Sequence, residues 1–145
     1  SLAGLFEYES KALQYMNFLK IKETCLYIHD LEGAKKFYHE TLELPLISYL
    51  EGKHIFFRAG SSVLLCFNPE DSRLKESPPA HYGAGKQHFA FEVNKHEYER
   101  TKTWIKDKGI RTTDTVIWKS GAESFYFEDP EGNVLEIVPD KGIWD

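Results

Sequence analysis

Residues 125–136, Phe-Tyr-Phe-Glu-Asp-Pro-Glu-Gly-Asn-Val-Leu-Glu, predict two short strands joined by a tight turn. Aromatic and branched residues favour the strands. The turn falls at residues 129–132 (Asp-Pro-Glu-Gly), because proline suits the second turn position and glycine supplies permissive backbone angles at the end. Glu136 stands out because it interrupts the apolar run from Val134 to Val138. A strand with such a run is expected to carry apolar residues on its buried face, where a carboxylate is unusual.

This stretch closes the second of two similar halves. The first half runs from Glu23, in Glu-Thr-Cys-Leu-Tyr-Ile, to Val-Leu-Leu at residues 63–65. The second runs from His88, in His-Phe-Ala-Phe-Glu-Val, to Glu136. Each half opens with an alternating strand, continues through a helix-like stretch and closes on a Val-Leu strand. Glu23 and His88 occupy equivalent opening positions, and Leu65 and Glu136 occupy equivalent closing positions.

The secondary structure expected in each half is strand, helix, strand, strand, strand. Asp30 is typical of a helix N-cap and predicts a helix over 31–42, while Gly109 ends a helix over 95–108. The strands are expected at 21–28, 46–50, 54–58, 62–67, 87–93, 113–118, 122–128 and 133–138. The sequence therefore predicts an α+β domain over 19–140. Its modules are 19–68 and 87–140, the connector between them is the proline- and glycine-containing stretch 69–86, and a helical extension occupies 1–18.

Composition narrows the range of partners and compartments. The formal net charge is −5 and no basic run is long, which argues against nucleic acid binding. No apolar run approaches the roughly 20 residues of a membrane span, and the N-terminus lacks a signal-peptide pattern. Cys25 is expected to share a strand face with Glu23, whereas Cys66 points opposite to Leu65, so the two thiols are poorly placed to pair. We therefore expect a cytoplasmic protein with reduced cysteines.

Glu23, His88 and Glu136 form the candidate metal site. Two copies of one module, facing each other, would bring the three side chains to one concave surface. A carboxylate on an apolar strand loses several kcal/mol of solvation unless a cation or donor compensates it. Two carboxylates and a neutral imidazole balance a divalent ion, and their hard oxygens favour Mn²⁺, Fe²⁺ or Zn²⁺. Three protein ligands leave open positions, as in catalytic sites.

Each of these residues also has an ordinary interpretation. Glu136 could lie on the exposed face of an antiparallel strand. His88 could be a core or surface histidine, and Glu23, near Lys20 and Lys22, a solvated charge. The repeat favours the metal site because it places all three at related positions. Cys25 is more often a small buried apolar residue than a nucleophile.

Three blocks of sequence carry a family resemblance: residues 27–32 with Phe37 and Tyr38, residues 87–93, and residues 125–136. Over about 19–140 the chain resembles the vicinal oxygen chelate superfamily, which includes glyoxalase I, bleomycin-resistance proteins, extradiol dioxygenases and fosfomycin-resistance enzymes. The resemblance implies two βαβββ modules forming a U-shaped mixed sheet around a divalent ion (Mn, Zn, Fe or Ni). It also implies a small substrate bound through neighbouring oxygens, and a homodimer whose ligands can come from different chains.

The resemblance also assigns roles to single residues. His88 and Glu136 match the usual second-module ligands, and Glu23 falls where the first ligand, usually His or Gln, sits. Leu65 falls where glyoxalase I carries an additional Glu, which argues against glyoxalase I proper.

Residues 120–127 resemble the matching stretch of the fosfomycin-resistance thiol transferases, whose serines and tyrosine line the antibiotic site. Ser120, Ser124 and Tyr126 are therefore expected to contact substrate. Cys25, where those enzymes carry a Thr, is a further candidate contact.

The leading hypothesis is a metal-dependent enzyme that polarises a carbonyl or alkoxide of a small oxygenated substrate through Lewis-acid catalysis. The reaction class stays open between isomerisation, addition to an epoxide and ring cleavage with O₂. The alternative is a metal-free small-molecule (drug) binding protein of the bleomycin-resistance type, in which Phe56, Phe67, Trp118 and Tyr126 sandwich a planar ligand. A third possibility is a regulatory module with a degenerate pocket.

Overall fold

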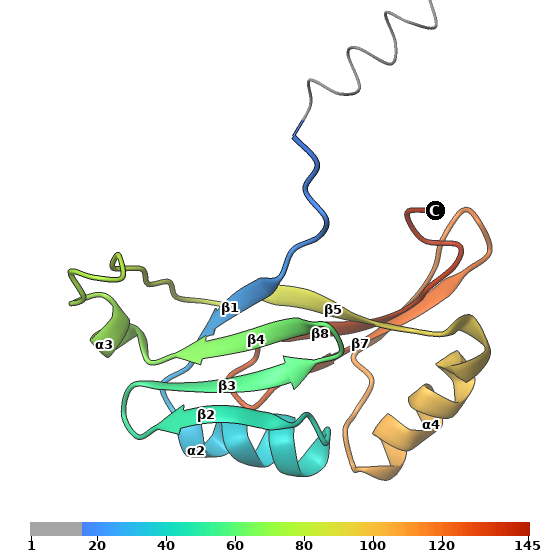
Figure 1. The fold of residues 1–145 in the computed structure, drawn as a ribbon. Helices are drawn as coiled ribbons and strands as arrows, with labels where there is room; N and C mark the ends of the chain where they lie inside the picture. Colours follow the sequence, from blue (N-terminus) through green and yellow to red (C-terminus); the bar gives the residue numbers. More distant parts are fainter. Residues whose placement is uncertain (1–15) are drawn as a thin grey trace, which may run out of the picture.

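The computed structural model describes residues 16–145. The predicted helical extension over 1–18 lies outside these residues except for 16–18, which form no helix. Eight strands form two four-stranded sheets, with the strand orders β1-β4-β3-β2 and β5-β8-β7-β6 (Figure 1). No helix within the described residues is both long and apolar enough to cross a membrane.

The first module contains β1 (Glu23–Tyr27), a helix, β2 (Leu46–Leu50), β3 (His54–Ala59) and β4 (Ser62–Phe67). Strand β1 runs parallel to β4, and β2, β3 and β4 are antiparallel. Asp30 caps the helix as expected, accepting a hydrogen bond from the backbone N–H of Gly33. Only the first part of this helix, α2 (Leu31–Ala34), has α-helical geometry. The helix continues as the π-helical η1 (Lys35–Thr41), because the N–H of Leu42 bonds to the carbonyl of Phe37 five residues earlier.

The second module repeats the same order, with β5 (His88–Val93), η2 (Lys95–Glu97), α4 (Tyr98–Asp107), β6 (Asp114–Ile117), β7 (Glu123–Glu128) and β8 (Val134–Pro139). Strand β5 runs parallel to β8, while β6, β7 and β8 are antiparallel. The predicted α+β fold of two βαβββ modules is confirmed. Backbone pairing divides the expected U-shaped sheet in two, because β1 and β5 pair with no strand of the other module in the described part of the chain.

One hydrophobic core spans both modules. Helices α2 and α4 lie on the same side of the sheets (Figure 1). Leu26 of β1 and Leu135 of β8 are buried in this single cluster together with Tyr38 and Ile105 from the helical segments. Alternation then directs residues such as Cys25 to the opposite face of each sheet, away from α2 and α4. The candidate site residues lie on these open faces.

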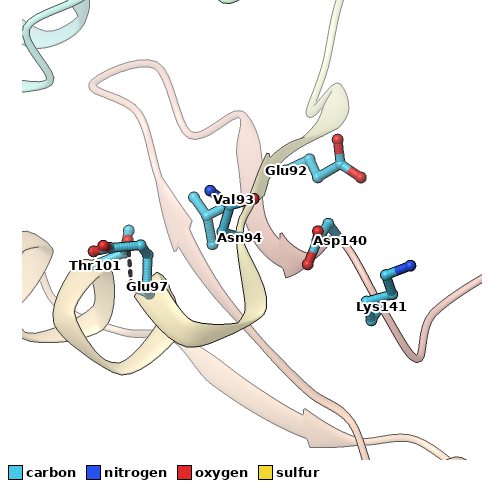
Figure 2. A pocket seen from close by; sticks show the side chains of 7 residues that line it. All are labelled: Glu92, Val93, Asn94, Glu97, Thr101, Asp140 and Lys141. Atoms are coloured by element: carbon cyan, nitrogen blue, oxygen red, sulfur yellow. Dashed lines mark hydrogen bonds between the residues drawn. The ribbon is translucent and has the colours of Figure 1, made fainter.

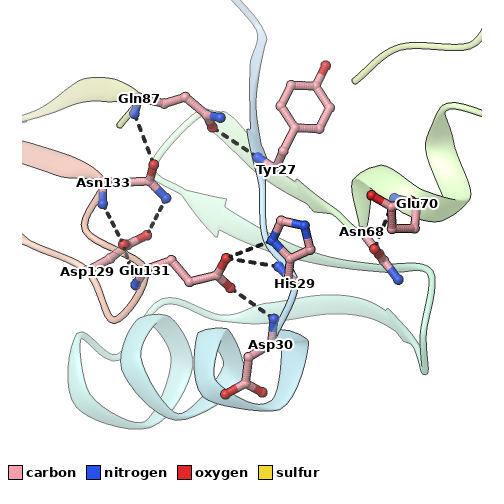
Figure 3. A network of polar contacts seen from close by, with 9 residues as sticks. All are labelled: Tyr27, His29, Asp30, Asn68, Glu70, Gln87, Asp129, Glu131 and Asn133. Atoms are coloured by element: carbon pink, nitrogen blue, oxygen red, sulfur yellow. Dashed lines mark hydrogen bonds and ion pairs between the residues drawn. The ribbon is translucent and has the colours of Figure 1, made fainter. Parts of the chain in front are cut away.

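The turn between β7 and β8 joins the modules. The Glu131 carboxylate accepts hydrogen bonds from the backbone N–H groups of His29 at 3.0 Å and Asp30 at 2.9 Å (Figure 3). It thereby satisfies free donors at the start of α2. Gly132 has a φ of 83°, a backbone conformation that favours glycine, which agrees with the predicted turn.

A buried carboxylate lies behind this turn. Asp129 accepts hydrogen bonds from the hydroxyl of Tyr38 at 2.7 Å and from the side-chain amide of Asn133 at 2.9 Å. Asn133 in turn accepts from the backbone N–H of Gln87, whose own side chain accepts from the N–H of Tyr27 at 3.0 Å. The network links the first module to the residue just before β5, and so fixes how the two sheets sit together.

Candidate metal centre

His88 and Glu136 lie together on the open face of the second module. Ala90 of β5 pairs with Glu136 of β8, and His88 lies two residues before Ala90, so it shares the same face. The His88 Nε2 atom is 3.3 Å from the Glu136 Oε1 atom. The Glu136 side chain is only 8% exposed, whereas that of His88 is 51% exposed. The buried carboxylate of Glu136 thus lies directly behind the solvent-accessible imidazole of His88.

The contact of the other ring nitrogen indicates which tautomer the neutral His88 ring adopts. Its Nδ1 atom lies 2.8 Å from the backbone oxygen of Val134. Because a carbonyl only accepts, Nδ1 carries the hydrogen, and in the neutral ring the lone pair of Nε2 faces Glu136. Two acceptors at this separation repel one another unless a proton or a cation is shared between them. A backbone carbonyl that fixes the free nitrogen in this way is typical of metal-binding histidines.

Tyr126 and Ser124 lie beside this pair. Tyr126 pairs with Glu136 across β7 and β8, and its ring centroid is 6.0 Å from that of His88. Burial, and then hydrogen bonding to Glu136, raise the pKa of the Tyr126 hydroxyl, which keeps it protonated as a donor. Ser124 is fully buried and accepts a hydrogen bond from the indole N–H of Trp118 at 3.0 Å.

Ser120 is engaged in local contacts. Its hydroxyl donates to the backbone oxygen of Gly142 and accepts from the N–H of Ala122 at 3.2 Å. These bonds hold the turn before β7. Both of these bonds are local, and within residues 16–145 neither joins Ser120 to His88 or Glu136.

Glu23, the third predicted ligand, lies on the other sheet. It is exposed at the start of β1, where it pairs with Val63 of β4. No group of three or more His, Cys, Asp or Glu side chains among the described residues could hold a metal ion. Glu23 and His88 line one cavity of about 780 Å³ between the modules. The structure thus brings two of the three predicted ligands into contact within a chain, and not the third.

Cys25 follows Glu23 along the open face of β1 and pairs with Leu65. Burial, and then the charge of Glu23, raise the pKa of the Cys25 thiol, which keeps it protonated at neutral pH. Cys66 is fully buried, and this burial also raises its pKa. Both cysteines are free, as expected from their opposite faces.

An aromatic cluster on the open face of the first module was not fully anticipated from sequence. The imidazole of His54 stacks on Phe56, with ring centroids 4.0 Å apart, and Phe67 packs edge-on against both rings. His81, from the connector, packs edge-on against Phe67 and its Nδ1 atom lies 2.9 Å from the hydroxyl of Tyr27. The position of His81 depends on tertiary contacts, and no sequence signal places it there.

A second hollow of about 610 Å³ lies at the far end of β5 from His88 (Figure 2). Its lining is mostly polar: Glu92, Val93, Asn94, Glu97, Thr101, Asp140 and Lys141. Asp140 accepts a hydrogen bond from the N–H of Lys95 at 2.8 Å, and the hydroxyl of Thr101 donates to the backbone oxygen of Glu97. These bonds are structural contacts around η2, and the hollow is separate from the His88–Glu136 pair.

Comparisons with known proteins agree with this arrangement. The family model described as "Glyoxalase/Bleomycin resistance protein/Dioxygenase superfamily" matches residues 20–137. Glutathione transferase FosA of Serratia marcescens is 29% identical over 133 residues, which cover 86% of this chain and 80% of that protein.

Solved structures share the fold. The structure of lactoylglutathione lyase from Agrobacterium tumefaciens matches with a TM-score of 0.82 and 33% identity, over 88% of this chain and 98% of that one. A glyoxalase/bleomycin resistance protein/dioxygenase from Nocardioides matches with a TM-score of 0.68 and 21% identity, over 95% of each chain. The family match spans both modules and both residues of the His88–Glu136 pair. The chain therefore belongs to the glyoxalase/bleomycin resistance protein/dioxygenase superfamily.

Proposed function

We propose that this protein is a metal-dependent enzyme of the superfamily that acts on a small oxygenated substrate, with Glu23, His88 and Glu136 as ligands of a divalent ion. The 3.3 Å approach of His88 Nε2 to Glu136 Oε1 is the main support. Two ligand atoms each about 2.0–2.1 Å from a tetrahedral zinc ion are about 3.3–3.4 Å apart, so the pair fits a shared cation. The names of two relatives, a glutathione transferase and a lactoylglutathione lyase, support a small-molecule substrate.

The residues around the pair define what this site would do. A bound ion would supply Lewis acidity toward a carbonyl or alkoxide oxygen. The carbonyl of Val134 holds the His88 ring in the tautomer that presents Nε2. Tyr126, kept protonated, would turn its hydroxyl from Glu136 to donate a hydrogen bond to a substrate oxygen. Ser124 is fully buried in the free chain and is a proposed contact on the sequence argument alone. Cys25 and Ser120 are proposed substrate contacts on the sequence argument alone.

We propose that Glu23 reaches the site from a second copy of the chain. Within one chain, Glu23 forms no metal-binding group with His88 and Glu136 among the described residues. Its side chain is exposed on the open face of the first module, while the pair lies on the open face of the second. A two-fold dimer that apposes unlike modules would complete two equivalent sites.

Metal titration tests the ligand assignment. The metal-free protein should bind Zn²⁺ or Mn²⁺ in calorimetry, and His88→Ala should weaken that binding by at least about 100-fold, because it removes a directly coordinating nitrogen. His96→Ala is the matched control, since His96 is an exposed histidine on η2 and should leave the affinity unchanged. Equal affinities for the wild-type and His88→Ala proteins would rule out the site.

Subunit mixing tests the shared site. Glu23→Ala and His88→Ala chains should each bind metal weakly, and tight binding should reappear after they are mixed and allowed to exchange. A mixed dimer has one site with both native residues and one with neither. If each site used ligands from one chain, mixing would restore nothing, so persistent weak binding would contradict a shared site.

The aromatic cluster of His54, Phe56 and Phe67 favours a second candidate function. Burial, and then the nearby Lys75 charge, lower the pKa of His54, so this ring is mostly neutral at pH 7 and stacks as an uncharged aromatic. Such a surface suits a planar ligand in a metal-free binding protein. Metal analysis of the purified protein separates the two: stoichiometric metal supports the enzyme, and its absence with tight binding of planar ligands supports the alternative.

A further inference from the structure

The cavity of about 780 Å³ between the modules, which we term the inter-module groove, has the size and lining of a small-molecule site. Ligand pockets usually enclose about 300–1,000 Å³ and combine apolar walls with a few polar groups. The groove walls include large side chains that are only partly buried against the core: Leu44, Phe89, Phe91 and Trp104. Two of the proposed metal ligands, Glu23 and His88, also line the groove. An apolar volume thus adjoins the candidate metal centre.

The groove runs along the edge of β5 that has no strand partner among the described residues. Its lining takes successive residues from both faces of this strand: His88, Phe89, Ala90, Phe91 and Glu92. Because side chains alternate along a strand, a lining that includes successive residues passes from the core side of the sheet, around the strand edge, to the open face. A ligand held on the open face can therefore reach the groove by crossing β5.

Ala90 lies between the His88–Glu136 pair and the groove. It pairs with Glu136 directly across β5 and β8, it is exposed, and it lines the groove. Its neighbours on the same face of β5, His88 and Glu92, both carry long side chains, so Ala90 is the lowest point along this strand. The course with the least steric hindrance across β5, for a ligand held at Glu136, therefore leads over the methyl group of Ala90.

We propose that the substrate carries an apolar chain that crosses β5 over Ala90 and lies in the inter-module groove, while the oxygenated end stays at the metal centre. This inference rests on the proposed function, because it needs the oxygenated end to be held beside Glu136. Adjacent strands are about 4.8 Å apart, so a chain of about four carbons is needed to pass from β8 across β5. The substrate class is thus a small oxygenated molecule with an apolar tail, and Ala90 determines which tails are accepted.

A series of straight-chain hydroxamic acids tests the apolar tail. These probes present two neighbouring oxygens to a metal ion and differ only in the length of the chain. Affinity for the Zn²⁺-loaded protein, measured by calorimetry, should rise at least about 10-fold from butanohydroxamic to octanohydroxamic acid, because each buried methylene contributes up to about fourfold. Equal affinities for the two acids would overturn the inference, and are the result expected if a segment of protein fills the groove.

Ala90→Ile tests the route across β5. A β-branched side chain suits a strand but occupies the space over Ala90, so it should abolish the gain from butanohydroxamic to octanohydroxamic acid. Acetohydroxamic acid, which has no tail to cross β5, should still bind. Thr115→Ile is the matched control, since Thr115 is exposed on β6 and is not part of the groove lining. The same gain in Ala90→Ile as in the wild type would overturn the route over Ala90.

Fluorine NMR of the wild-type chain locates the tail directly. Protein that contains 5-fluorotryptophan has fluorine resonances from Trp104, Trp118 and Trp144, and the Trp104→Phe variant identifies that of Trp104. Octanohydroxamic acid should shift the Trp104 resonance, because Trp104 lines the groove, and acetohydroxamic acid should not. Trp144 is 99% exposed and serves as the internal control. An unshifted Trp104 resonance with octanohydroxamic acid bound would overturn the inference.

Metal titration of the same preparations separates this inference from the proposed function. If Zn²⁺ binds as expected and the short and long hydroxamic acids bind equally well, the metal centre stands and the apolar route is wrong. If no Zn²⁺ binds, the proposed function is wrong, and the inference that rests on it is wrong as well.

Discussion

Asp129→Ala is expected to lower the free energy of unfolding by about 3–5 kcal/mol, as removal of one partner from a buried charged network does. Asp129 is 5% exposed and accepts hydrogen bonds from Tyr38, from the side chain of Asn133 and from the backbone N–H groups of Glu131 and Asn133. Alanine would leave these donors without a partner. Because Tyr38 and Asn133 are buried, water cannot replace the carboxylate without opening the core.

Urea denaturation followed by circular dichroism measures this loss. Tyr38→Phe is the matched control, since it keeps the aromatic ring and removes one hydrogen bond, for an expected loss of about 1 kcal/mol. The two substitutions combined should cost less than their sum, because they remove a common interaction. A loss for Asp129→Ala no larger than that for Tyr38→Phe would show that the other hydrogen bonds to this carboxylate contribute little.

Glu136→Gln is expected to affect metal binding and stability in opposite directions. The amide keeps the size of the side chain but removes its charge, so affinity for Zn²⁺ or Mn²⁺ should fall by at least about 100-fold. In the metal-free protein the same change removes a buried carboxylate that faces the lone pair of His88, and it should raise the free energy of unfolding by about 1 kcal/mol. This pattern is that of a residue maintained for binding at the expense of stability.

Calorimetry and urea denaturation of the same metal-free preparations give both quantities. Glu128→Gln is the matched control, because Glu128 lies on the neighbouring strand β7 in an exposed ion pair with Lys86 at 2.9 Å. It should leave metal affinity unchanged and shift stability by less than about 1 kcal/mol. If Glu136→Gln bound metal as tightly as the wild type, Glu136 would not be a ligand.

The sequence predicted the strands and the joining turn well, because their signals are local. The turn at 129–132 needs proline and glycine at particular positions, and the apolar strands around it alternate or run continuously. For Glu136 the sequence left two positions open, a buried one inside the apolar run and one on an exposed strand face, and the structure shows the buried one. The π-helical geometry of η1 was missed because it depends on how the segment packs, which 3.6-residue periodicity does not report.

The internal repeat in the sequence could not predict that Glu23 lies apart from His88 and Glu136 within one chain. Equivalent positions in two copies of a module say nothing about whether those copies face each other within one chain or across two. The position of His81 was equally hidden. The hydroxyl of Ser72, which is fully buried, donates to the backbone oxygen of His81 at 2.6 Å and draws the connector onto the sheet. That contact joins residues whose local sequence indicates only a polar loop.

The two halves of the repeat are joined unequally. The acidic turn between β7 and β8 holds the start of α2 in the first half through the hydrogen bonds that Glu131 accepts. Its counterpart between β3 and β4 is a short Gly-Ser turn with no side chain long enough to reciprocate, and its residues line the groove instead. The two modules are thus connected by hydrogen bonds at the β7–β8 turn, whereas the equivalent β3–β4 turn borders the groove between them. The internal two-fold symmetry therefore holds for the strand order of the two sheets but not for the turns that connect them.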